Sequence, residues 1–130
     1  MFLLSTNDIA QFVRLAQAED FARKNRVLLL RHKPTETDID ISLGILPFEE
    51  EMVDRGSTKT FAALSIRLPT PEDLIIMKAI AHRPKDLDDI RTIADKYPDL
   101  DRKRIEEWLK SFGEALELPD LWNQIRPLLK

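Results

Sequence analysis

The sequence TPEDLIIMKAIAHRPKDLDDI, residues 70–90, contains an apolar helix and an acidic helix separated by a short break. Thr70 is a typical N-cap and Pro71 suits the first helical position, so we expect a helix to begin there. Arg83 and Pro84 interrupt the pattern, because proline cannot continue a helix and instead opens the next one. The stretch therefore predicts two consecutive helices with charged residues close to buried apolar surface.

Lys78 lies in the middle of the apolar helix. At about 100° per residue it projects between Leu74 and His82 and has apolar positions on both sides. Two interpretations are open. The lysine stem can cover apolar surface while its ammonium group reaches solvent, or the ammonium group can pair with a carboxylate or a phosphate.

Asp86 falls on the apolar side of the second helix, and Asp89 lies at the edge of that side, one turn later. The apolar face itself consists of Leu87, Ile90, Ile93 and Ala94. Asp86 near a helix start can serve the helix dipole or a cap. An acid facing the core also needs a partner, because an unpaired buried charge is costly. Lys78, Arg83 and Lys85 are the nearby cations, so an ion-pair network that links the two helices is a second interpretation.

Four other charged residues, three in this stretch and one directly after it, have simpler explanations. Glu72 and Asp73 occupy the first turn of the apolar helix, where the helix dipole favours anions. Asp88 and Arg91 point away from the apolar face of the second helix, and we expect them on the surface.

The order of elements along the chain predicts an α+β fold. Residues 1–130 are expected to form one domain, in which residues 1–69 hold a helix and a small sheet and residues 70–130 form a helical tail. The sheet is expected to have helices packed on it. The predicted elements are a helix at 7–25, strands at 27–30 and 37–43 forming a hairpin, a short helix opening at Pro47, one or two strands within 58–68, and about four helical segments after residue 70.

The second predicted strand, TDIDISLG, carries two acids on one face. Alternation along a strand places Asp38, Asp40 and Ser42 together. The opposite face, with Ile39, Ile41 and Leu43, is expected in the core, and residues 27–30 are expected to be covered on both faces. Two carboxylates at this spacing can hold a hard cation such as magnesium. The alternative is a solvated outer face, with Asp38 acting only as a turn residue.

The overall composition excludes several classes of site. The net charge is -3, from 20 basic and 23 acidic residues, so the chain has no overall attraction to nucleic acid or anionic membranes. A local basic patch is still expected from Arg23, Lys24, Arg26, Arg31 and Lys33. The lack of cysteine excludes disulfides and thiolate chemistry, and two histidines argue against a zinc site. The apolar runs are too short to span a bilayer, so we expect a cytoplasmic protein without a membrane partner.

Three stretches, VLLLRHKPTETDIDISLG, PFEEEMVDR and LPTPEDLIIMKAIAHRPKDLDDI, resemble the nucleotidyltransferase-fold family that includes the bacterial AbiEii-type toxins. The last one resembles the family's lysine helix followed by its Arg…Lys-Asp…Asp element. The resemblance implies that two Mg²⁺ ions align a nucleoside triphosphate with an acceptor hydroxyl, with RNA as one acceptor. It also implies substrate-binding roles for Lys78, Asp86 and Asp89, which would meet the phosphates or orient the lysine. Asp40 would be a catalytic metal ligand, with Asp38 as an additional acid at the metal.

The sequence departs from this family at its early motif, a glycine turn followed by D-x-D. All three glycines, Gly44, Gly56 and Gly113, follow Asp38 and Asp40. The resemblance therefore assigns Asp40 to the third, later carboxylate of the family. We expect a shortened nucleotidyltransferase-like fold that is incomplete or inactive as an isolated chain, with the missing carboxylates lost or supplied by another chain.

Two other functions fit the same residues. One is a non-catalytic interaction module, of a toxin–antitoxin pair or of a nucleotide- or RNA-binding protein. The other is a structural α+β domain whose charges only form ion pairs. An uncovered strand edge would favour a protein partner or a homo-oligomer.

Overall fold

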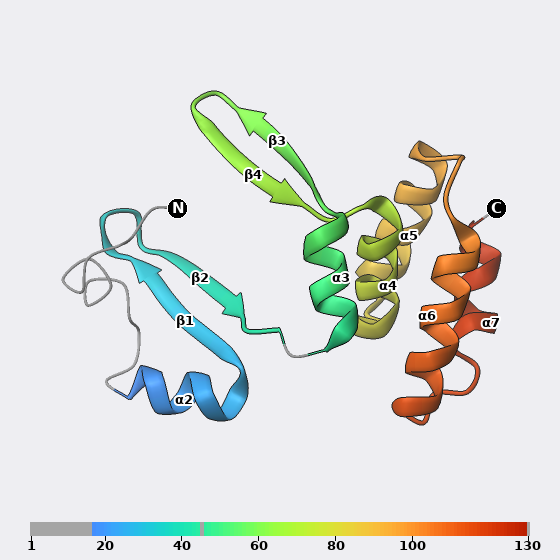
Figure 1. Cartoon of the computed structure of the whole chain (residues 1–130), viewed down its shortest axis with the longest axis horizontal. Helices are drawn as coiled ribbons and strands as arrows, with labels where there is room; N and C mark the ends of the chain where they lie inside the picture. Colours follow the sequence, from blue (N-terminus) through green and yellow to red (C-terminus); the bar gives the residue numbers. More distant parts are fainter. Residues whose placement is uncertain (1–16, 45, 130) are drawn as a thin grey trace. The chain divides into compact units, whose positions relative to one another are not determined.

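The computed structural model describes residues 17–44 and 46–129, and Figure 1 shows its elements. The chain divides into two compact units, Met1–Glu50 and Glu51–Lys130. That the whole chain forms one domain stays a prediction.

The first unit holds a helix and a hairpin. Its elements are α2 (Ala18–Asn25), β1 (Val27–His32), the 3₁₀ turn η1 (Lys33–Thr35) and β2 (Thr37–Ser42). Helix α2 ends at Arg26, which adopts a left-handed conformation with φ 55° and donates its N–H to the carbonyl of Ala22. The predicted hairpin is confirmed, because β1 and β2 pair antiparallel. The start of the helix predicted at 7–25 lies outside the described residues.

The hairpin register shows which residues share a face. Asp38 lies opposite Arg31, and Asp40 lies opposite Leu29, as expected for one face of β2. On the other face, Ile39 and Ile41 are 41% and 42% exposed, so their predicted place in the core is wrong. The prediction that residues 27–30 are covered on both faces is also wrong, because they are only half-buried. Within the described residues the sheet has two strands, and such a ribbon has too little surface to bury an apolar face.

The second unit is mostly helical and contains a second hairpin. Helix α3 (Pro47–Arg55) begins in the first unit and ends in the second. It is followed by β3 (Ser57–Phe61), β4 (Leu64–Leu68), α4 (Pro71–Ala81), α5 (Pro84–Lys96), α6 (Arg102–Ala115), α7 (Leu121–Ile125) and the 3₁₀ turn η2 (Arg126–Leu129). The α+β class is confirmed. The expected small sheet consists of two separate two-stranded hairpins.

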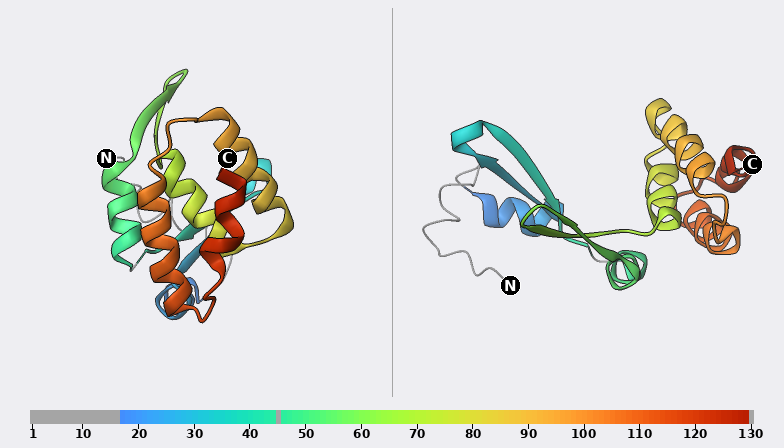
Figure 2. Two further views of the ribbon diagram at one scale, coloured as in Figure 1. Left: turned by 90° about the vertical axis from the view of Figure 1, so that its right-hand side faces the viewer. Right: turned by 90° about the horizontal axis from the view of Figure 1, so that it is seen from above.

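The core of the second unit lies among α4, α5, α6, α7 and η2, which Figure 2 shows side by side. Each helix contributes one apolar stripe, and burying a large aliphatic side chain contributes roughly 2 kcal/mol. The buried residues are Ile75, Ile76, Ala79, Ile90, Ile105, Leu109, Leu121, Ile125 and Leu129. This packing fixes the rotation of α4 and α5 about their axes, and with it the direction of their charged side chains.

Asp73 is a buried carboxylate that links three helices. Arg104 of α6 donates from Nε to Asp73 of α4 at 2.7 Å and from Nη1 to Glu51 of α3 at 2.9 Å. Arg55 of α3 lies 3.4 Å from the second Asp73 oxygen. Burial lowers the pKa of Arg104, but its hydrogen bonds to Asp73 and Glu51 outweigh this and raise that pKa. The helix-dipole explanation for Asp73 was therefore incomplete, because its main partners come from other helices.

We predict that Arg104→Met destabilises the protein by about 3 kcal/mol, because it leaves the buried Asp73 with the more distant Arg55 alone. The free energy of unfolding in urea measures this. Lys103→Met is the matched control, since the Lys103 pair with Glu107 is exposed, and it should change stability by less than about 0.5 kcal/mol. Equal effects of the two substitutions would contradict a structural role for Arg104.

Candidate functional site

The α4–α5 pair positions Lys78 at the edge of the core. Thr70 caps α4 by accepting a hydrogen bond from the Asp73 N–H at 3.2 Å, as predicted. Ile75 and Ala79 are buried, which places Lys78 in the last turn at the margin of the buried face. The helix ends at His82, whose φ of 50° turns the chain towards α5.

Lys78 forms ion pairs with both acids predicted for the site. Its Nζ lies 2.5 Å from Asp89 Oδ2 and 3.6 Å from Asp86 Oδ1. The Lys78 side chain is 24% exposed and the Asp89 side chain 51% exposed. Of the two interpretations of this lysine, pairing with a carboxylate describes the structure, and the three residues lie together as one cluster.

Asp86 is fully buried, as the helical periodicity predicts. Arg83 donates two hydrogen bonds to the Asp86 carboxylate, from Nε to Oδ2 at 2.6 Å and from Nη2 to Oδ1 at 3.1 Å. The Arg83 backbone N–H also donates to Oδ2 at 3.2 Å, so Asp86 closes the first turn of α5. The Arg83 hydrogen bonds lower the pKa of Asp86 from 3.8 to about 2, against the opposing effect of burial and with a smaller contribution from Lys78.

The charges of this cluster balance, with two cations, Lys78 and Arg83, and two anions, Asp86 and Asp89. The two carboxylates differ in how firmly they are held. Asp86 is buried and held by Arg83, whereas Asp89 is half-exposed, and exposed ion pairs contribute little to stability. A multivalent anion from solvent can therefore compete with Asp89 for Lys78 more easily than with Asp86.

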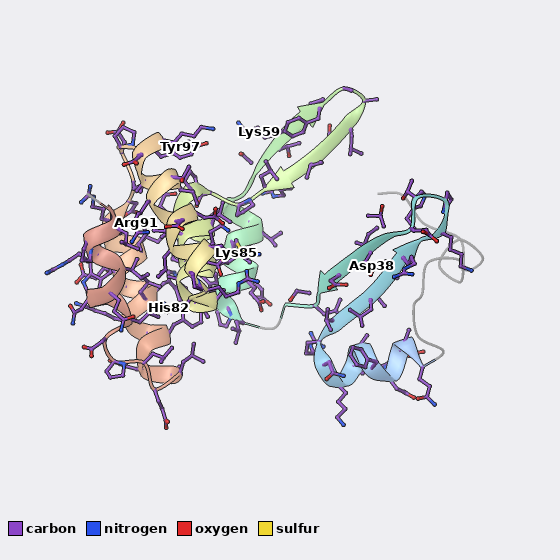
Figure 3. All side chains as sticks on the ribbon, turned by 180° about the vertical axis from the view of Figure 1, so that it is seen from behind. Asp38, Lys59, His82, Lys85, Arg91 and Tyr97 are labelled. Carbon is purple, nitrogen blue, oxygen red and sulfur yellow. The ribbon has the colours of Figure 1, made fainter. Side chains whose placement is uncertain are left out.

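The neighbourhood of the cluster contains further charges. Lys85, at the start of α5, is exposed, and Figure 3 shows it together with His82 and Arg91. Asp88 and Arg91 form a surface pair at 2.6 Å, which confirms their predicted exposure. A cavity of about 390 Å³ lies beyond the end of α4, lined by His82, Glu117, Leu118, Pro119, Asp120, Leu121 and Gln124. Its lining does not include Lys78, so it is separate from the cluster.

The two acids of the predicted metal site lie on β2, in the first unit. Arg31 donates to both oxygens of Asp38, at 2.6 Å and 3.1 Å, and Figure 3 shows Asp38 on its hairpin. Asp38 would have to give up this pairing to hold a cation. Mg²⁺ is commonly held by one or two carboxylates together with substrate phosphates, and its binding at Asp40 and Asp38 stays a prediction. Within residues 17–44 and 46–129, no group of three or more potential metal ligands comes together.

Most cations of the expected basic patch form ion pairs or hydrogen bonds within the first unit. Arg23 pairs with Glu19 at 2.7 Å, and Arg31 pairs with Asp38. Arg26 donates to the carbonyls of Leu43 and Gly44, both at 3.2 Å. Three of the five cations therefore stabilise the hairpin and its helix.

Sequence reasoning missed the Asp73 cluster with Arg55, Arg104 and Glu51. The one signal available was the position of Asp73 three residues before Ile76, on the side of α4 that faces its neighbours. Glu72, next to Asp73, accepts a hydrogen bond from the Asp101 N–H at 3.1 Å, so it also contacts the residue that precedes α6.

In the part of the chain that the structure describes, no helix is both long and apolar enough to cross a membrane.

A family described as nucleotidyl transferase of unknown function (DUF2204) matches residues 35–125, more than two thirds of the chain. The chain belongs to this family. The matched range contains Asp38, Asp40, Lys78, Asp86 and Asp89, and the chain is nucleotidyltransferase-like. Comparison with curated proteins and with solved structures gave no match. The narrower likeness to AbiEii-type toxins and the loss of the early motif stay predictions.

The lowered pKa of Asp86 predicts a specific acid sensitivity. Because its pKa is about 2 in the folded chain and 3.8 without these contacts, its charge stabilises the fold above about pH 4. This contribution is lost as the pH falls from about 4 to about 2. The difference in free energy of unfolding between the wild type and Asp86→Asn should shrink over this range.

Denaturant unfolding at several pH values between 2 and 5, followed by circular dichroism, measures this difference. Asp88→Asn, which removes an exposed carboxylate, should keep the wild-type pH dependence. A constant difference between the wild type and Asp86→Asn would contradict the role given to Arg83.

Proposed function

We propose that the chain binds a nucleoside triphosphate, whose phosphates contact the ammonium group of Lys78. The observation that carries this proposal is the Lys78–Asp89 pair, a half-exposed and replaceable ion pair in a member of a nucleotidyl transferase family. A triphosphate carries several negative charges and can outcompete the single carboxylate of Asp89 for the lysine.

Asp86 and Asp89 would position Lys78 in this proposal. Asp86 stays with Arg83 and holds the start of α5 next to the lysine, since removing a buried carboxylate from its partner is costly. Asp89 orients the ammonium group in the absence of nucleotide and exchanges with a phosphate on binding. Lys78 therefore makes the direct contact, and the two acids set its direction.

The proposed reaction is the transfer of a nucleotide from a nucleoside triphosphate to a hydroxyl group, with RNA as a candidate acceptor. This is the reaction that the family resemblance implies. Mg²⁺, when bound, would screen the phosphate charges and polarise the transferred group. Asp40 would be its ligand, with Asp38 nearby on the same face of β2. The further carboxylates that such a site needs would come from another part of the biological assembly, for example a partner chain of a toxin–antitoxin pair.

The balanced charge of the cluster favours a second candidate, a domain that keeps the fold without the chemistry. Lys78 and Arg83 are neutralised by Asp86 and Asp89, which is sufficient for a purely structural network. In this case the chain acts as a non-catalytic interaction module or as a structural domain. Nucleotide binding separates a structural domain from the other two functions, and nucleotide transfer separates the enzyme from the interaction module.

We predict that Lys78→Met weakens binding of a nucleoside triphosphate at least tenfold, because a hydrogen bond to a charged group contributes about 1.5–3 kcal/mol. Isothermal titration calorimetry with the four ribonucleoside triphosphates, with and without Mg²⁺, measures the affinity. Lys110→Met, which removes an exposed lysine of α6, is the control and should bind as the wild type does. If Lys78→Met keeps wild-type affinity and folds more stably, Lys78 is structural only.

A second experiment tests the reaction itself. We expect Mg²⁺-dependent transfer from labelled nucleoside triphosphates to RNA, measured in the presence of any partner chain that copurifies. Asp40→Asn should abolish this transfer while leaving the fold intact, and Asp20→Asn on α2 should not change it. Nucleotide binding without transfer under all these conditions would contradict the catalytic role and favour the interaction module.

A further inference from the structure

One face of the β3–β4 hairpin carries four exposed apolar side chains, Phe61, Leu64, Ile66 and Leu68. The register pairs Phe61 with Leu64, Lys59 with Ile66 and Ser57 with Leu68, so these side chains share one face. Every residue of both strands is exposed, and Phe61 and Leu64 reach 59% and 61%. Figure 1 shows the hairpin extending away from helices α4–α7 of its unit. Three of the four, Leu64, Ile66 and Leu68, belong to β4, whose open edge can pair with another strand.

The base of the hairpin is firmly attached to α3. Arg67 donates from Nε to the carbonyl of Val53 and from Nη2 to that of Asp54, both at 2.7 Å. A side chain at Gly56 would lie 2.8 Å from the Leu68 carbonyl oxygen, so the close approach of β4 to the end of α3 requires a glycine. The strand is therefore held in place, and its outer edge points away from β3.

The strand edges of the two hairpins differ in charge. Pairing β3 with a copy of itself around its central residue would bring two Lys59 side chains together, and Figure 3 shows Lys59 on this strand. Pairing β2 with a copy of itself around Ile39 would place Asp38 opposite Asp40, and pairing around Asp40 would bring two Asp40 side chains together. Strand β1 is half-buried along residues 27–30. Strand β4 is exposed throughout and has the uncharged Ile66 at its centre.

We propose that β4 pairs antiparallel with β4 of a second copy of this chain, around a two-fold axis at Ile66. In this register Leu64 lies opposite Leu68 of the second copy, Ser65 lies opposite Arg67 of the second copy, and the two Ile66 residues face each other. No two like charges are opposite, and the guanidinium group of Arg67 is already engaged by α3. The occupant is therefore a second copy, because the strand is complementary to itself.

The pairing also explains how the hairpin is stabilised. Within the described residues, β4 pairs only with β3, and an isolated two-stranded hairpin is marginally stable in water. Joining two copies gives a four-stranded sheet in which Leu64, Ile66 and Leu68 of both copies lie side by side on one face. It also removes two open strand edges, which soluble proteins otherwise protect. This inference uses no residue of the proposed nucleotide site and does not depend on that function.

Sedimentation equilibrium over a range of protein concentrations tests the proposal. The wild type should be a dimer at micromolar concentration. Ile66→Lys and Ile66→Glu should each be monomers with half the wild-type mass, because each places two like charges in direct opposition. An equimolar mixture of Ile66→Lys and Ile66→Glu chains should recover the dimer mass, since opposite charges then face each other.

Thr60→Lys is the matched control, because it adds a charge on the polar face of β3, opposite Ser65, and should remain dimeric. Circular dichroism checks that every variant keeps the wild-type helix content. The proposal is overturned if the wild type is a monomer, which would leave β4 for a different protein, or if both Ile66 variants remain dimers. Failure of the mixed variants to associate would also overturn the proposed register.

Discussion

The buried charge of Asp86 is the constraint on which the α4–α5 pair depends. A carboxylate without solvent must be compensated by nearby cations and donors, and here Arg83 supplies two side-chain bonds and one backbone bond. This requirement holds the Arg83-Pro84 corner in place and starts α5 at a defined position. Lys78, on the preceding helix, completes the compensation at 3.6 Å. The location of the candidate site thus follows from how one buried charge is satisfied.

Asp73 and Asp86 are the two buried charged residues among those described, and both lie in the first turn of a helix. Arginine compensates each of them, Arg104 for Asp73 and Arg83 for Asp86. Such pairs add little net stability compared with apolar packing, but breaking one is costly. They therefore restrict how the helices of the second unit can be arranged, while the aliphatic core supplies most of the stabilisation.

Much of the second unit could be predicted from local signals in the sequence. Thr70, Pro71 and Pro84 mark helix starts, and the helical periodicity places Asp86 on the buried face. The partner of Asp73 could not be predicted, because Arg104 is 31 residues away and only packing brings them together. The exposure of Ile39 and Ile41 was missed because alternation shows which residues share a face but not whether anything covers it. The roles of Asp38, Asp40, Lys78, Asp86 and Asp89 in substrate and metal binding rest on family resemblance and stay predictions.

Lys78 has two roles, as a partner of two aspartates and as the proposed contact for nucleotide phosphates. These roles are compatible because Asp89 is half-exposed and can be exchanged. The most direct measurement is NMR of lysine side chains during titration with a nucleoside triphosphate and Mg²⁺, with the Lys78 signal assigned by substitution. We predict a saturable change at the Lys78 side-chain signal, with no comparable change at Lys110. Saturable nucleotide binding that leaves the Lys78 signal unchanged, or no binding at all, would contradict it.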